Sequence, residues 1–125
     1  MGLIYKRIFI EGNRGKTQVD VLFDSGASVS FLRREVAERI ADLLPLPSPR
    51  SFSLDDGKGA LEVREVTHVD IHLEEGTIFD EVVVASNLAE ELVIGASTLQ
   101  RWRVKLDFEQ DEVILDKRLL NLKLI

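Results

Sequence analysis

The strongest constraint on this chain is an apolar strand, residues 19–23, that runs directly into the polar turn Asp24–Ser28. Asp and Ser side chains bond nearby backbone in turns, and Gly permits backbone conformations that other residues avoid. Such a turn holds one carboxylate, that of Asp24, at the end of a strand. The motif occurs once in 125 residues. A reaction that needs an acid and a base at the same moment would therefore need a second copy, most simply from another chain.

A second motif, the apolar pair Val93-Ile94 followed by Gly95, precedes a short helix that we expect at 96–102. Together with Asp24-Ser25-Gly26-Ala27-Ser28, it resembles the signature of the retropepsin-like (retroviral-type) aspartic peptidases. All five positions of the first motif match, and the resemblance extends from about Ile4 to Leu115. It implies an all-β, closed-barrel-like fold with one main helix and a flap hairpin.

The resemblance also implies a function, a homodimeric aspartic endopeptidase in which Asp24 from each subunit activates a water molecule that hydrolyses a peptide bond. Two carboxylates about 3 Å apart cannot both ionise, so they share one proton and act as acid and base. By the same resemblance, Gly26 brings its backbone N–H to the carboxylate and Ser25 bonds across the dimer axis. Ser28 is expected to hydrogen-bond the outer carboxylate oxygen, and Ala27 is small enough to let the substrate backbone pass.

Other interpretations of the motif stay open. Asp-Ser-Gly is also ordinary turn chemistry. The phosphate-binding loop of actin-like sugar kinases begins similarly, but those folds need two large α/β domains and this chain has room for one. A retropepsin-like dimerisation or peptide-binding module with weak or no turnover is the main alternative to an active enzyme. A purely structural β-domain would leave Asp24 without a role.

Composition favours a single cytoplasmic domain that spans residues 1–125. Hydrophobic residues make up 45% of the chain, which is enough for one core, and no cysteine is present. A net charge of −6 argues against binding to a nucleic-acid backbone. No apolar stretch approaches the length that crosses a membrane. The expected partners are a second copy of the chain and a peptide or protein substrate, with no metal or organic cofactor.

Alternating apolar residues predict mostly strands. We expect strands at 3–11, 16–23 and 77–85, and a last hairpin from 103–108 and 112–115. The apolar tail 119–125 predicts a terminal strand that pairs within the chain or between subunits. Trp102, at the end of the short helix, is expected to anchor the core.

The one long helix is predicted at about 32–44, because apolar residues recur there at helical spacing. Ser30 would cap its start and Pro45 would end it. The proline-rich stretch 45–49 is expected to be an extended connector.

A flap hairpin is predicted around the loop Asp55-Asp56-Gly57-Lys58-Gly59, between strands at 51–54 and from Ala60 onward. Glycines at its tip would let the hairpin open for substrate and close again; an ordinary surface hairpin is the alternative. The strand that leaves this loop shows one buried parity: Leu61, Val63, Thr67, Val69, Ile71 and Leu73.

The opposite face of that strand carries His68, Asp70 and His72. Three such side chains on one face suggest a divalent cation site, but polar residues on the wet face of a strand are the normal pattern, which we favour. Five apolar residues are candidates for either the substrate pocket or the core: Leu22, Val29, Ile78, Val82 and Val93.

Overall fold

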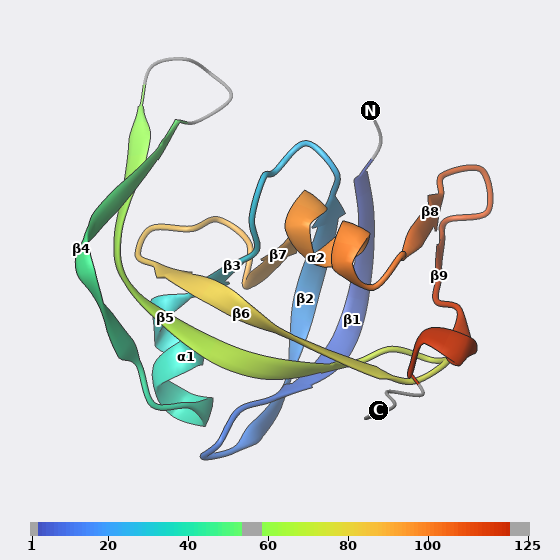
Figure 1. Cartoon of the computed structure of the whole chain (residues 1–125), viewed down its shortest axis with the longest axis horizontal. Coiled ribbons are helices and arrows are strands. Elements are labelled where there is room, and N and C mark those ends of the chain that lie inside the picture. Colours follow the sequence, from blue (N-terminus) through green and yellow to red (C-terminus); the bar gives the residue numbers. More distant parts are fainter. Residues whose placement is uncertain (1–2, 54–58, 121–125) are drawn as a thin grey trace, which may run out of the picture.

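A computed structural model describes residues 3–53 and 59–120 (Figure 1). Its strands are β1 (Leu3–Glu11), β2 (Lys16–Asp24), β3 (Phe31–Arg33), β4 (Leu44–Ser53), β5 (Ala60–His72), β6 (Thr77–Ala85), β7 (Leu92–Ile94), β8 (Lys105–Asp107) and β9 (Glu112–Ile114). Its helices are α1 (Arg34–Ile40) and α2 (Ala96–Arg101), with a 3₁₀ helix at Lys117–Leu120. None of the helices in the described ranges is long and apolar enough to cross a lipid bilayer.

Seven of the strands form one sheet in the order β1-β2-β7-β3-β6-β5-β4. The end of β1 also pairs with β5, where Phe9, Ile10 and Glu11 face His72, Ile71 and Asp70. This second pairing closes six strands into a ring and leaves β4 outside it. The all-β, barrel-like architecture expected from the sequence is thereby confirmed, with β8 and β9 as a separate hairpin.

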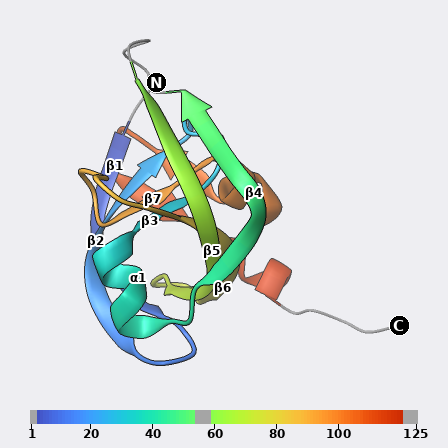
Figure 2. The same ribbon diagram turned by 90° about the vertical axis from the view of Figure 1, so that its left-hand side faces the viewer.

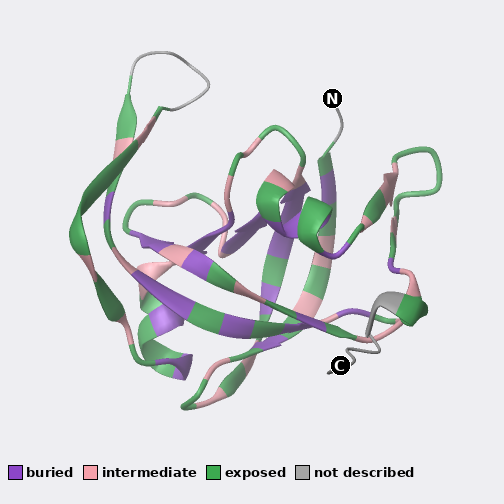
Figure 3. Cartoon of the chain, viewed as in Figure 1, coloured by how far each residue is buried: buried purple, intermediate pink, exposed green. Residues whose placement is uncertain are grey.

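The core fills the inside of this ring, as the alternation of buried and exposed residues along β5 and β6 shows (Figure 3). One face of β5 is buried at Val63, Thr67, Val69 and Ile71, as its parity predicted. Trp102 is 5% exposed and packs in the main cluster, which confirms its expected role as a core anchor.

A second, smaller apolar cluster lies under the β4–β5 hairpin. Its buried members are Leu22, Phe31, Val63, Ala85 and Val93. The arms of β4 and β5 extend beyond the ring in Figure 1, and Figure 2 looks onto them. This cluster therefore includes both Val63 of the hairpin and Leu22 of β2, two residues before Asp24.

The main helix is shorter than the predicted 32–44, and the predicted cap is wrong. Residues 31–33 form β3, inserted between β6 and β7, so that α1 begins at Arg34 after an extended Arg33. The helix ends at Ile40, well before Pro45, because the β1–β2 turn takes over its last carbonyl: Arg14 N donates to Ile40 O at 2.8 Å. A tertiary contact, which periodicity does not reveal, sets this boundary.

The proline-rich stretch 45–49 belongs to β4 instead of forming a connector. It lies at the outer edge of the sheet, where a residue without an N–H donor is tolerated, and its register with β5 shifts between Pro45 and Arg50. At the other end of the chain, residues 117–120 form a 3₁₀ helix where the terminal strand was expected to begin. The remainder of that predicted strand, 121–125, lies outside the described residues.

Candidate active site

Asp24 is the last residue of β2 and is partly buried. β2 runs parallel to β7, with Leu22 beside Val93 and Phe23 beside Ile94. The chain then turns tightly: the N–H of Gly26 donates to Asp24 Oδ1 at 2.9 Å, and Ala27 N donates to Asp24 O at 3.1 Å. The first of these bonds holds the carboxylate, and the second closes the backbone turn that follows it.

Gly95 and the first turn of α2 hold this loop from behind. Ala96 N donates to Ala27 O at 2.7 Å, and Ser97 N donates to Ser28 O at 3.2 Å. The fold allows no side chain at Gly95, since a Cβ there would lie 2.2 Å from the carbonyl oxygen of Val29. The two sequence motifs are thus packed directly against each other.

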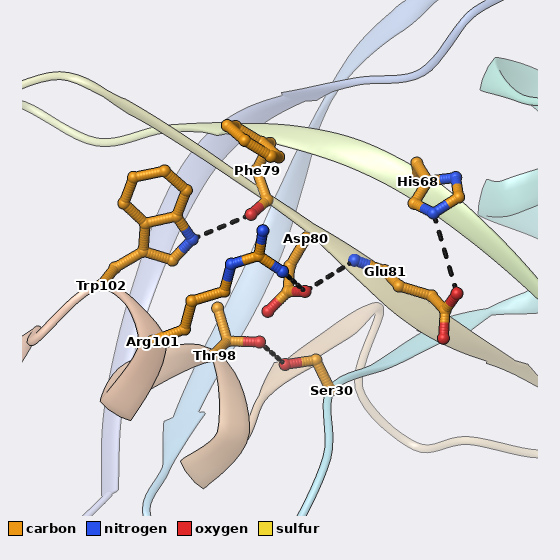
Figure 4. A network of polar contacts seen from close by, with 8 residues as sticks. All are labelled: Ser30, His68, Phe79, Asp80, Glu81, Thr98, Arg101 and Trp102. Carbon is orange, nitrogen blue, oxygen red and sulfur yellow. Dashed lines mark hydrogen bonds and ion pairs between the residues drawn. The ribbon is translucent and has the colours of Figure 1, made fainter. Parts of the chain in front are cut away.

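Two buried hydroxyls that the sequence did not single out for this purpose complete the contact (Figure 4). Ser30 Oγ lies 2.6 Å from Thr98 Oγ1 and accepts a 3.0 Å hydrogen bond from Gly95 N. Both side chains are almost fully buried, at 1% and 0% exposure. The only signal in the sequence is that Ser30 directly precedes the apolar pair Phe31-Leu32, a position that equally predicts a helix cap.

A groove of about 390 Å³ opens beside Asp24. It is lined by Leu22, Asp24, Gly26, Ala27, Ser28, Phe31, Phe52, Ser53, Leu61, Leu88, Glu90 and Val93. The rings of Phe31 and Phe52 meet edge to face, with centroids 5.1 Å apart, so the hairpin arm and β3 share one apolar wall. Most of the lining residues are apolar, and Asp24 lies among them.

The candidate pocket residues divide between this groove and the core. Leu22 and Val93 line the groove, and Val29 packs against the cluster beneath it. Ile78 and Val82 are fully buried in the main core, away from the groove lining.

Other predicted site residues lie elsewhere. Ser25 is exposed and borders a separate hollow of about 470 Å³ formed with α2 and the β8–β9 hairpin. Ser28 is also exposed, and a bond from its hydroxyl to Asp24 is not among the hydrogen bonds of the described residues. Of the flap tip, Asp55, Asp56, Gly57 and Lys58 lie outside the described residues, and Gly59 is exposed just before β5.

The polar face of β5 is occupied by pairwise contacts. His72 Nδ1 lies 2.9 Å from Thr77 Oγ1 and its Nε2 lies 3.2 Å from Glu11 Oε1, while His68 lies 3.7 Å from Glu81. Within residues 3–53 and 59–120, no group of three His, Asp or Glu side chains could hold a metal ion.

Solved structures of two retroviral-type protease domains share this fold. The retroviral protease-like domain of Ddi1 from Leishmania major superposes with a TM-score of 0.67 at 20% identity, covering 93% of this chain and 90% of that domain. EIAV protease, solved with the inhibitor HBY-793, gives a TM-score of 0.63 at 22% identity, covering 82% of this chain and 90% of that protein. At these identities the likeness establishes the fold.

The amino-acid sequence identifies the family to which the chain belongs. Residues 10–101 match the sequence model of the gag-polyprotein putative aspartyl protease family. This segment contains the Asp24 loop, the lining of the groove and Gly95, and it spans well over half of the chain. The protein therefore belongs to the gag-polyprotein putative aspartyl protease family.

Proposed function

We propose that two copies of this chain, each a single domain over residues 1–125, form an aspartic endopeptidase with one shared active site. The observation that carries the proposal is the fixed carboxylate of Asp24 facing an apolar groove. A groove of this kind suits an extended peptide, whose backbone pairs like a strand and whose side chains fill apolar hollows.

The chemistry follows from having one carboxylate in each chain. When two Asp24 side chains meet across a two-fold axis, mutual repulsion leaves one ionised and one protonated. The ionised carboxylate takes a proton from water, whose oxygen attacks the scissile carbonyl carbon, while the protonated carboxyl donates to the carbonyl oxygen. Exposed Ser25 and Gly26 leave this side of the loop open to a second copy. The carboxyl that took the proton from water then gives it to the amide nitrogen as the C–N bond breaks, so the two carboxylates and water complete the hydrolysis.

The variant Asp24→Asn tests the proposal. Asn preserves the shape of the side chain but cannot take a proton from water, so hydrolysis of a mixed peptide library should fall to a trace. Asp70→Asn is the matched control, since Asp70 is exposed on β5 and does not line the groove. Circular dichroism should show the same fold for both variants and the wild type.

Two results would distinguish the competing functions. Cleavage by Asp24→Asn at the wild-type rate would show that another group is the base, and the proposal would be wrong. Peptides that bind to the wild-type groove without being cut would instead favour the peptide-binding module.

A further inference from the structure

Glu90 is a second acidic residue that lines the groove, in addition to Asp24. It lies in the loop between β6 and β7, residues 86–91, and is partly buried. Leu88 of the same loop also borders the groove, as do the hairpin residues Phe52 and Leu61. Among the described residues that line the groove, two are acidic and none is Lys or Arg.

The backbone around Glu90 is fixed by Arg33 at the end of β3. The guanidinium of Arg33 donates to the carbonyl of Leu88 at 3.0 Å and also to that of Ala89. The backbone N–H of Arg33 donates to Glu91 O at 2.9 Å. These contacts lie on both sides of Glu90 in the chain, so they fix the position of its backbone at the edge of the groove.

The nearby cations already have acidic partners. On its other side, Glu90 borders a hollow of about 620 Å³ that contains Lys6, Arg7 and Arg33. Lys6 pairs with Asp111 at 3.7 Å, Arg7 with Asp20 at 2.9 Å and Arg33 with Glu35 at 3.0 Å. No ion pair of Glu90 occurs in the described part of the chain, so its charge is available to a ligand.

We infer that Glu90 makes this groove selective for peptides that carry Lys or Arg beside an apolar side chain. The inference rests on the proposed function and adds the substrate class. The apolar walls weaken the solvent screening of Glu90, so a peptide cation gains attraction and a peptide carboxylate meets repulsion. Attraction favours the basic peptide and repulsion excludes the acidic one.

Three synthetic peptides test the inference. They share one apolar scissile pair and differ only in carrying Lys, Gln or Glu at the flanking positions. Wild-type protein should cleave them in the order Lys, Gln, Glu, with a change in kcat/KM of about fivefold at each step, the effect of one partly exposed ion pair. The spread should shrink when salt is raised to about 1 M, because salt screens such pairs.

Variants assign the effect to Glu90. Glu90→Gln should cut all three peptides at similar rates, and Glu90→Lys should prefer the Glu peptide. The control Glu38→Gln removes the same charge from the exposed surface of α1, outside the groove lining, and should preserve the wild-type order. If Glu90→Gln retains the wild-type order, other groups select the charge and the inference is overturned.

A binding measurement separates this inference from the proposed activity. Fluorescence anisotropy of the labelled peptides with Asp24→Asn requires no turnover. Binding in the order Lys, Gln, Glu without cleavage by the wild type would support the role of Glu90 and contradict the enzyme. Equal binding of the three peptides would overturn the role of Glu90 alone, and no binding or cleavage of any of them would overturn both.

Discussion

Gly95 shows how one residue determines the position of another that is distant in the sequence. Its Cα lies so close to the Asp24 loop that a Cβ would fall 2.2 Å from Val29 O and 2.8 Å from Ala27 O. Both contacts are to backbone, which cannot move aside like the end of a flexible side chain. Gly95 therefore permits the short distance between α2 and the loop that presents Asp24.

Gly95→Ala should consequently destabilise the protein by about 3 kcal/mol, the upper part of the usual range for overpacking, and should also lower the peptidase rate. Chemical denaturation gives the free energy of unfolding. Gly15→Ala is the matched control, because the nearest atom to a Cβ at Gly15 is 3.5 Å away, an ordinary contact distance. Equal stability of the two variants would show that the loop relaxes and that the close approach is not required.

At the residue scale, the sequence predicted contacts between near neighbours better than contacts across the fold. The bond from Gly26 N to Asp24 spans two residues, and turn chemistry suffices to anticipate it. The position of Ser30 in the sequence predicts a helix cap, whereas its partners in the structure, Gly95 and Thr98, lie 65 and 68 residues away. The sequence does not distinguish a serine that hydrogen-bonds a distant helix from one that caps the helix directly after it.

At the scale of elements, regular segments were predicted well and their ends were not. β1 and β6 have the predicted bounds, and along each strand the residues of one face are buried or partly buried. α1 is shorter than predicted at both ends. Residues 31–33 form strand β3, and the β1–β2 turn donates a hydrogen bond to the carbonyl of Ile40. The elements are intrinsic to the sequence, whereas their boundaries depend on what packs against them.

The docking of α2 onto the Asp24 loop should depend more on Ser30 than on Thr98. Ser30→Ala leaves both Gly95 N–H and the Thr98 hydroxyl without their partner in a buried site, which should cost about 2 kcal/mol. Thr98→Val keeps the volume and leaves the Gly95–Ser30 bond in place, so it should cost about 1 kcal/mol. Unfolding free energies of the two variants should show this order.

Ser97→Ala is the control for this comparison. Ser97 is exposed on the same helix turn and contacts the loop through its backbone N–H, which the substitution retains. The double variant of Ser30 and Thr98 should lose less stability than the sum of the single changes, because the two share one hydrogen bond. Additive losses would mean that the two hydroxyls act independently.

For the whole molecule, the sequence indicated the fold class but not how the sheet closes. Closure depends on the short pairing of Phe9–Glu11 with Asp70–His72, two strands that are far apart in the chain. No local pattern distinguishes that pairing from an open edge. The groove likewise combines residues of β2, β3 and β7, an arm of the hairpin and the 86–91 loop. The sequence anticipated the Asp24 loop, Leu22 and Val93 as parts of a site, but not that Leu88 and Glu90 would border it.

Each closed ring contains one copy of Asp24, so a reaction that needs two such carboxylates needs two chains. If activity needs two chains, adding Asp24→Asn protein to an equal amount of wild type should lower the peptidase rate to about half, because random pairing puts half of the wild-type chains into mixed dimers. A threefold excess of the variant should lower the rate to about a quarter by the same statistics. Each mixed dimer has one carboxylate, which cannot serve as acid and base together.

The rates of these mixtures can be interpreted only if the protein is dimeric, so the molecular mass has to be measured as well. Sedimentation equilibrium at the assay concentration should give twice the chain mass of 14.1 kDa for wild type, variant and mixture. Asp70→Asn, added in place of the catalytic variant, should raise the rate in proportion to its concentration, because that protein retains its own Asp24. A rate that is unchanged by the Asp24→Asn protein, in samples with time to exchange subunits, would show that one chain suffices and that the shared site is wrong.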